Sequence, residues 1–184
     1  SANAVAAPAT LPLTVMPALG ATSWEVTNTG GTTLGTAFTG ACDDTAGFAI
    51  IDATSASGDI DAYDYAYSIW VNDVIFEAPD PVDLTGNTVT AGPMVMSGLN
   101  VSVEYSFSDM VQAGRIRAIF QNPTGNPVNI SVDIPVNLGS GGATVIEATS
   151  SGDVVFDAAD SWVVTSDDVP AVDPVNTTVL WGAG

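Results

Sequence analysis

Two acidic loops carry the side chains best suited to binding a hard metal ion. Their carboxylates fall into two groups of three along the chain: Asp59, Asp61 and Asp64, and Asp153, Asp157 and Asp160. Ca²⁺ prefers several oxygen ligands from one short loop, and closely spaced aspartates supply them together with backbone carbonyls. Ca²⁺ is therefore the one candidate cofactor. The alternative is that these aspartates cap turns and keep the surface acidic.

Three tyrosines alternate with other residues from the end of the first acidic loop onward. Tyr63, Tyr65 and Tyr67 would share one face of an extended strand, because side chains alternate between the two faces. A row of this kind can stack against sugar rings, which makes carbohydrate a candidate partner. Packing in a core or an interface is the commoner use of such a stripe. A secreted carbohydrate-binding module is therefore our second functional hypothesis.

The composition excludes most forms of catalysis. The chain of 184 residues has 21 acidic residues, two arginines, no lysine and no histidine, which gives a net charge of -19. Without histidine there is no Ser-His-Asp site, and without lysine there is no Schiff base. The few glutamates form no obvious acid pair of the kind that a glycosidase needs. We expect a protein that is not an enzyme, and its charge also argues against nucleic acid as a partner.

Both cations lie in one predicted strand. Arg115 and Arg117 are two residues apart, so they project from the same face and form a positive site on an otherwise acidic protein. One interpretation is an ion pair within the chain, which is worth little at a surface. The other is a contact with acidic residues of an identical subunit, because arginine is favoured at such interfaces.

The residue pattern predicts an all-β fold. Apolar and polar residues alternate in residues 101–107, 115–120 and 128–136, and glycine, proline and asparagine separate such segments. Residues 122–127 are expected to form a turn that joins two antiparallel neighbours, 115–121 and 128–138. Further strands are predicted at residues 23–27, 48–52, 67–76, 87–91, 144–148, 162–165 and 177–181. About ten strands at this spacing indicate a single antiparallel β-sandwich of jelly-roll type.

Two stretches of the chain resemble each other. Residues 47–73 and 142–168 each start with an apolar strand, pass through Thr/Ser-rich residues to a Gly-Asp pair, and reach a Trp-Val pair. The alignment treats Ala56 as an insertion. The similarity indicates an internal duplication within one domain, residues 21–184. Coincidence between two Thr/Ser/Gly-rich segments is the alternative.

Residues 1–20 form an extended apolar arm ahead of this domain. No charge occurs in residues 4–19, Leu11, Leu13 and Val15 alternate on one face, and three prolines exclude a helix. An apolar arm is unfavourable in water, so we expect it to pair with a sheet as an edge strand. Pairing within the chain and insertion into an identical neighbour both remain open.

The first residues are small and lack a methionine, as after cleavage of a signal peptide. We therefore expect a secreted protein, extracellular or at the cell surface. No apolar run is long enough for membrane insertion. The single Cys42 can form no disulfide within the chain and is expected to be a small core residue.

An apolar N-terminal arm followed by a β-sandwich resembles the secreted subunits of bacterial and archaeal surface filaments, which assemble by donating an N-terminal strand. The resemblance rests on residues 4–19 and on the strand pattern. It implies a non-catalytic homopolymer subunit of a filament or matrix, with Leu11, Leu13 and Val15 as donor residues. In this first functional hypothesis, Arg115 and Arg117 lie at subunit contacts and Ca²⁺ screens the repulsion between acidic subunits.

Overall fold

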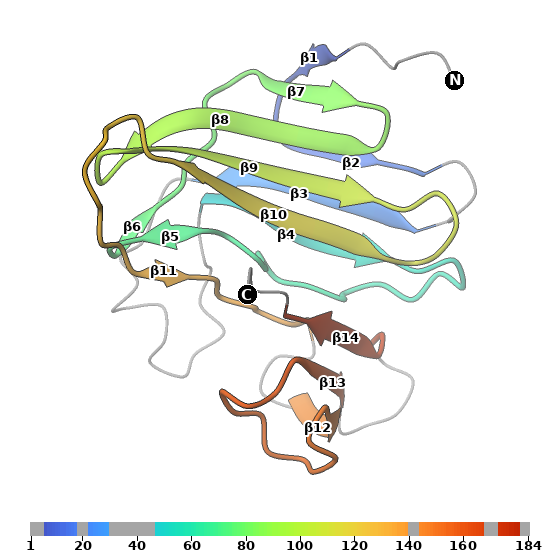
Figure 1. Cartoon of the computed structure of the whole chain (residues 1–184). Helices are drawn as coiled ribbons and strands as arrows, with labels where there is room; N and C mark the ends of the chain where they lie inside the picture. Colours follow the sequence, from blue (N-terminus) through green and yellow to red (C-terminus); the bar gives the residue numbers. More distant parts are fainter. Residues whose placement is uncertain (1–5, 18–21, 30–46, 140–143, 168–172, 181–184) are drawn as a thin grey trace.

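Figure 1 shows the chain as a computed structural model, in which residues 6–17, 22–29, 47–139, 144–167 and 173–180 are described. Their regular structure is entirely β, with fourteen strands in four antiparallel sheets. The all-β prediction is confirmed. The single sandwich of about ten strands is not confirmed, because the fourteen strands are divided among four sheets and two of the predicted strands are interrupted. Over these same ranges, no helix capable of crossing a membrane occurs.

The first layer is a five-stranded sheet with the order β1-β7-β8-β9-β10. Its strands are β1 (Ala7–Ala9), β7 (Val82–Thr85), β8 (Thr88–Met96), β9 (Leu99–Phe107) and β10 (Gly114–Gln121). Buried and less buried residues alternate without exception along β9. One face of this sheet therefore contributes side chains such as Val101, Val103 and Tyr105 to the core, and the other face is polar.

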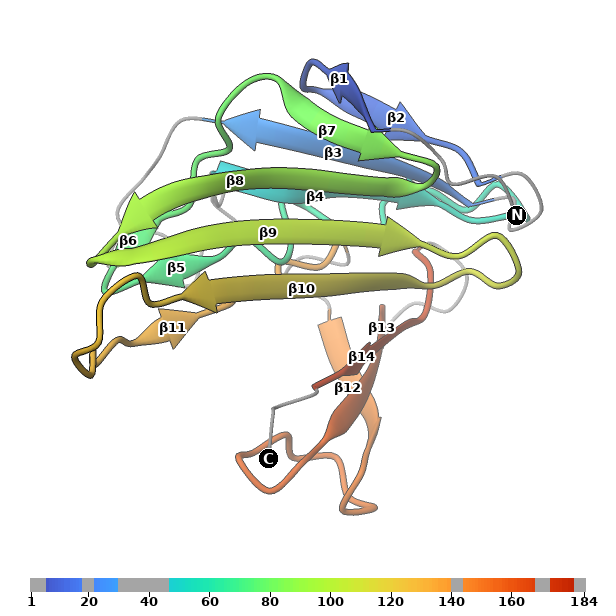
Figure 2. The ribbon, with the colours of Figure 1, turned by 45° about the horizontal axis from the view of Figure 1, so that its top comes forward.

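The second layer is built around β2 (Leu13–Val15), β3 (Ser23–Thr29) and β4 (Gly47–Thr54). A smaller sheet extends it: β5 (Trp70–Val71), β6 (Val74–Ile75) and β11 (Val132–Asp133). Segments that flank this sheet bond to β4: the Phe48 N–H donates to the carbonyl oxygen of Phe76, next to β6, at 3.0 Å, and the backbone N–H groups of Ile50 and Ala66 donate to each other's carbonyl oxygens at 3.0 and 2.8 Å. The two layers face each other in Figures 1 and 2, which makes this part sandwich-like.

Aromatic side chains connect the two layers. Phe48 of β4 stacks on Tyr105 of β9 with ring centroids 4.6 Å apart, and Trp24 of β3 stacks on Phe107 at 4.7 Å. The buried Tyr105 hydroxyl donates to the carbonyl oxygens of Phe48, at 2.7 Å, and Tyr67, at 3.0 Å. One cluster of buried residues thus includes both sheets.

Two predicted strands are interrupted in the structure. The strand expected at residues 67–76 is a hairpin, because Asn72 and Asp73 both adopt positive φ and form a tight turn between β5 and β6. In residues 128–136 only Val132 and Asp133 form a strand. Pro135 has no N–H to donate, and its carbonyl oxygen instead accepts from the backbone N–H of Tyr67 at 2.8 Å.

The turn predicted at residues 122–127 does not join neighbouring strands. Before it, β10 pairs with β9 in the first layer; beyond it, β11 pairs with β5 in the second layer. The chain therefore passes from one layer to the other at this point. Consequently β10 is the last strand of its sheet.

A fourth sheet projects from the two layers, as Figure 2 shows. It consists of β12 (Thr144–Thr149), β13 (Trp162–Asp167) and β14 (Asn176–Val179). Thr178 and the Tyr67 hydroxyl share a hydrogen bond of 2.8 Å, and the Asn176 side-chain amide donates to the carbonyl oxygen of Ala62 at 3.0 Å. These contacts turn one face of the small sheet toward the sandwich-like part.

Candidate functional site

In the first acidic loop, residues 55–59 form a turn held largely by their own side chains, with one further bond from the Ala56 N–H to Gln112 Oε1 at 3.3 Å. Ser55 and Ser57 both donate side-chain hydrogen bonds to the Asp59 carboxylate, the former at 2.9 Å. The backbone N–H of Asp59 donates to Ser55 Oγ at 3.0 Å. The hydrogen bond from the Ser57 hydroxyl lowers the pKa of Asp59 most, and the bond from the Ser55 hydroxyl lowers it further. Asp59 therefore stabilises the conformation of its own turn.

The second acidic loop contains the same five-residue turn. The backbone N–H of Thr149 donates to the Asp153 carbonyl oxygen at 3.1 Å, and Thr149 Oγ1 donates to the Asp153 carboxylate at 3.2 Å. Gly152 adopts a φ of +90°, matching +92° at Gly58 in the first loop. The turns thus align residue by residue, so the insertion at Ala56 is unnecessary there. The repeat partner of residues 47–73 includes positions 142, 143 and 168, which lie outside the described residues.

Asp160 holds the rest of the second loop together. Its buried carboxylate accepts hydrogen bonds from Ser150 Oγ at 3.0 Å, from the Ser151 N–H at 2.9 Å and from the Asp157 N–H at 3.1 Å. These bonds lower the pKa of Asp160 to about 2, and the bond from the Asp157 N–H has the largest effect. Asp157 in turn accepts from the backbone N–H of Ala159 at 2.7 Å.

The predicted calcium ligands are not gathered into a metal centre. In the described ranges of the chain, no three His, Cys, Asp or Glu side chains are placed to share a metal ion. Asp61 adopts a φ of +70°, and the pKa of its carboxyl is raised by desolvation and by the charges of Asp173 and Asp52. Asp64 forms a backbone hydrogen bond to the Asn137 carbonyl oxygen at 3.1 Å. The geometry favours the interpretation in which the aspartates cap turns.

The three tyrosines do not form the expected platform. Tyr65 and Tyr67 have positive φ values, so residues 63–67 do not form the continuous strand that would align their side chains. Tyr63 stacks on Trp24 with centroids 6.2 Å apart and meets Tyr67 edge-on at 5.6 Å. Burial raises the pKa of both Tyr63 and Tyr67. These two rings pack against the core, which leaves Tyr65 as the remaining member of the predicted row.

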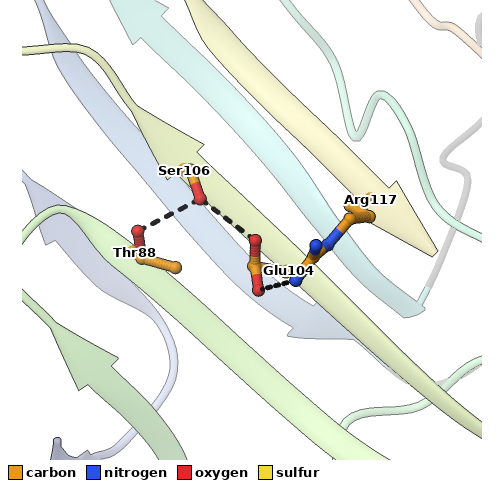
Figure 3. Close-up of polar contacts among 4 residues, drawn as sticks. All are labelled: Thr88, Glu104, Ser106 and Arg117. Carbon is orange, nitrogen blue, oxygen red and sulfur yellow. Dashed lines mark hydrogen bonds and ion pairs between the residues drawn. The ribbon is translucent and has the colours of Figure 1, made fainter. Parts of the chain in front are cut away.

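The two arginines have different surroundings. Arg117 Nη2 lies 2.8 Å from Glu104 Oε2 on the neighbouring strand β9. Figure 3 shows that Glu104 also accepts from Ser106 Oγ at 3.5 Å, which in turn accepts from Thr88 Oγ1 at 3.1 Å. A polar network thus crosses β8, β9 and β10 on the outer face. Arg115 has no ion-pair partner among the described residues.

The N-terminal arm pairs with its own chain at two sheet edges. In β1, Ala7 lies opposite Leu84 and Ala9 opposite Val82, so β1 forms the edge of the first layer. In β2, Val15 lies opposite Trp24, so β2 forms an edge of the second layer. Figure 2 shows the arm passing from one layer to the other.

The predicted donor residues of the arm contact the core. Val15 is buried, and Leu11 and Leu13 are partly buried against the same cluster of apolar side chains. The alternation of Leu11, Leu13 and Val15 that the sequence predicts therefore places these three side chains on the face of the arm that contacts the core. The prediction of an edge strand within the chain matches this single-chain structure, and pairing with a neighbour stays a prediction.

One apolar surface escaped the sequence analysis. On β12–β14, cross-strand pairing places five apolar side chains on the face that turns away from the sandwich-like part, beside the polar Ser166 and Thr177: Val145, Ala148, Trp162, Val164 and Val179. Val179 is 54% exposed and Val145 is 37% exposed. The alternation in residues 144–148 predicts one such face, but only the position of the sheet tells which face turns away from the sandwich-like part.

Comparisons with protein-family models, with curated proteins and with solved structures find no match to this chain. Functional assignment therefore depends on the edges, faces and charges described above.

Proposed function

We propose that the protein is a non-catalytic structural subunit, extracellular or at the cell surface, which assembles with identical copies into a filament or matrix by exchanging its N-terminal strands. One observation carries the proposal: a single short arm supplies the edge strand of two different layers, β1 beside β7 and β2 beside β3. Edge strands can be replaced by the same strands from another copy without changing the ladders that receive them.

Burial of apolar side chains makes donation of the arm to a neighbouring copy more favourable than an arm detached from any sheet. An arm detached from any sheet would expose Val15 and uncover the apolar side chains beneath it, at a cost of about 1.5–3 kcal/mol for one buried side chain of this size. An arm donated to a neighbour would make the same contacts as it makes within its own chain. Protein concentration and the segment that connects the arm to β3 then decide between the two arrangements.

Engineered disulfides can distinguish pairing within a chain from pairing between chains. Thr14 and Glu25 lie opposite each other on β2 and β3 and are both exposed. We propose the double variant Thr14→Cys/Glu25→Cys in a Cys42→Ser background, oxidised under conditions in which light scattering shows large particles. Exchange predicts a ladder of covalent multimers on a non-reducing gel, whereas a closed arm gives only monomers.

The matched control is Thr88→Cys/Ser106→Cys in the same background. These residues lie opposite each other on consecutive strands of one hairpin, so their disulfide forms within a chain whether or not the arm is exchanged. Large particles that yield only intrachain disulfides in both variants would refute strand exchange.

A carbohydrate-binding module remains the second candidate, and its support moves from the tyrosines to the small sheet. Trp162 lies on the outward apolar face of β13, next to Val164 and Val179. An aromatic ring on a flat open sheet can stack on a sugar ring. A glycan array should then show binding that Trp162→Ala abolishes and Val95→Ala, an exposed residue on β8, preserves. An array without binding by the unmodified protein removes this candidate.

A further inference from the structure

β10 is the longer of the two edge strands of the first layer. β10 has eight residues, compared with three in β1 at the opposite edge. Within the described part of the chain, its only ladder is the one with β9. An exposed strand edge presents a row of backbone donors and acceptors that can pair with another strand.

The residues that present these groups follow from the alternation of antiparallel pairing. The backbone N–H of Phe107 donates to Asn87, on the β8 side of β9, and the N–H of Ser108 donates to Ala113, on the β10 side. Alternation then directs Ser106 and Glu104 toward β10. Since Arg115 and Arg117 lie opposite these two residues, they point back to β9.

The intervening residues of β10 therefore direct their N–H and carbonyl groups toward the open edge: Gly114, Ile116, Ala118 and Phe120. The side chains of Ile116, Ala118 and Phe120 are partly buried against the core. Ile119 lies on the opposite, outer face and is 38% exposed. A strand added at this edge would meet apolar side chains on one face and the arginine-bearing face on the other.

We propose that two copies of this protein pair through their β10 edges, antiparallel, about a two-fold axis at Ala118. The inference rests on the proposed self-assembly but uses a surface separate from the arm. In this register the two Ala118 residues exchange backbone hydrogen bonds, and Ile116 of each copy lies opposite Phe120 of the other. All of these residues have outward-directed backbone groups, so the ladder is complete on both sides of the axis.

The charges disfavour a register shifted by one residue. Centring the axis on Arg117 would place the two copies of this guanidinium directly opposite each other, which is unfavourable. With the axis at Ala118, Arg117 lies opposite Ile119 of the second copy, and Arg115 lies opposite Gln121. Arg117 is also partly neutralised by Glu104 of its own chain, 2.8 Å away.

The charge distribution makes β10 the surface at which two acidic copies can approach most closely. Two proteins with a net charge of -19 repel each other over most of their surfaces. Residues 110–132 contain both arginines and no acidic residue. Contact through β10 therefore brings together the parts of the two molecules that repel least, and the sheet continues across the axis.

A single cysteine at the axis tests the proposal. Paired backbones at Ala118 would bring the two α-carbons to about 5.5 Å, within the range of a disulfide. Ala118→Cys in a Cys42→Ser background should form a covalent dimer on oxidation, several-fold faster than Val95→Cys, an exposed residue on β8, in the same background. Equal rates, or no dimer, would overturn the proposal.

A second variant removes the pairing without introducing a new bond. Ala118→Pro loses only an outward-directed N–H, a position that tolerates proline on an edge strand. It should abolish the dimer in sedimentation velocity while the far-UV circular dichroism stays unchanged; a folded variant that still dimerises contradicts the proposal.

With one cysteine per chain, Ala118→Cys can yield only dimers. The Thr14/Glu25 ladder reports the arm separately, so either proposal can fail alone.

Discussion

At the scale of single residues, the aspartates act on the backbone that surrounds them. Asp59 and Asp160 each accept several hydrogen bonds from neighbouring serines or backbone N–H groups. Charge-assisted hydrogen bonds of this kind stabilise the ionised form of a carboxyl. The acidity of these loops is therefore partly a requirement of turn structure.

Asp160 should make the stability of the protein depend on pH in the acidic range. Its pKa of about 2 lies below the ordinary value of 3.8, so its contribution is complete above pH 4 and disappears as the pH falls toward 2. Asp160→Asn should therefore lower Tm at pH 7, and the difference from the unmodified protein should shrink toward pH 2. Thermal unfolding followed by circular dichroism tests this, with the exposed Asp83→Asn as control.

Asp61 should behave in the opposite way. Desolvation and the charges of Asp173 and Asp52 raise its pKa, so the folded state disfavours the ionised carboxyl, and this penalty is present above the folded pKa and relieved as the pH falls. Asp61→Asn should raise stability at pH 7, by no more than about 0.5 kcal/mol. Asp61→Ala should gain less, because alanine tolerates the φ of +70° poorly and asparagine tolerates it well. Urea unfolding at pH 7 and pH 4 decides this; an Asn variant less stable than the unmodified protein contradicts it.

Residue spacing indicated where polar and aromatic side chains occur but not what they contact. The predicted row of Tyr63, Tyr65 and Tyr67 assumed a regular strand, and positive φ at Tyr65 and Tyr67 breaks its alternation. Neither tyrosine is a residue type for which a left-handed backbone is expected. The tertiary contacts of this segment, such as the Tyr67–Thr178 hydrogen bond across 111 residues, determine its conformation.

At the scale of strands, local patterns predicted β9 and β10 well, because more buried and less buried residues alternate along most of each strand. The apolar run at residues 48–51 located β4, which is buried over its first four residues. The strand expected at residues 128–138 failed. The part of it that forms a strand, β11, pairs with β5 in the second layer and not with β10. Periodicity does not encode a pairing between such distant segments. The same limit applies to β10, whose open edge follows from the crossing of the chain between layers.

The Tyr105 hydroxyl should be an important connection between strands of different layers. It is fully buried and donates to carbonyl oxygens of Phe48 and Tyr67. Tyr105→Phe leaves these acceptors without that donor and should cost about 1–3 kcal/mol in the free energy of unfolding. Tyr67→Phe should cost less, because its partner Thr178 is only partly buried and water can replace the bond. Urea unfolding of both variants tests the order, and an equal or reversed order contradicts it.

At the scale of the whole molecule, assembly must overcome a net charge of -19 per copy. Both proposed contacts, the exchanged arm and the β10 pair, bring acidic subunits close together. The arm contributes no charge in residues 4–19, and β10 contributes the two arginines. The contacts therefore use the least acidic segments, while the remaining surface opposes growth through long-range repulsion.

Screening of this repulsion should control the extent of assembly. Raising the ionic strength from about 0.01 to about 0.15 M shortens the Debye length from about 30 to about 8 Å, so light scattering should increase. Since the aspartates of both loops are held in turns and no three acidic side chains of the described residues share a metal position, CaCl₂ and NaCl should act alike at equal ionic strength. A chelator should leave the particles unchanged. Particles that dissolve in chelator at constant ionic strength would show instead that a specific divalent cation joins the subunits, through carboxylates brought together only in the assembly.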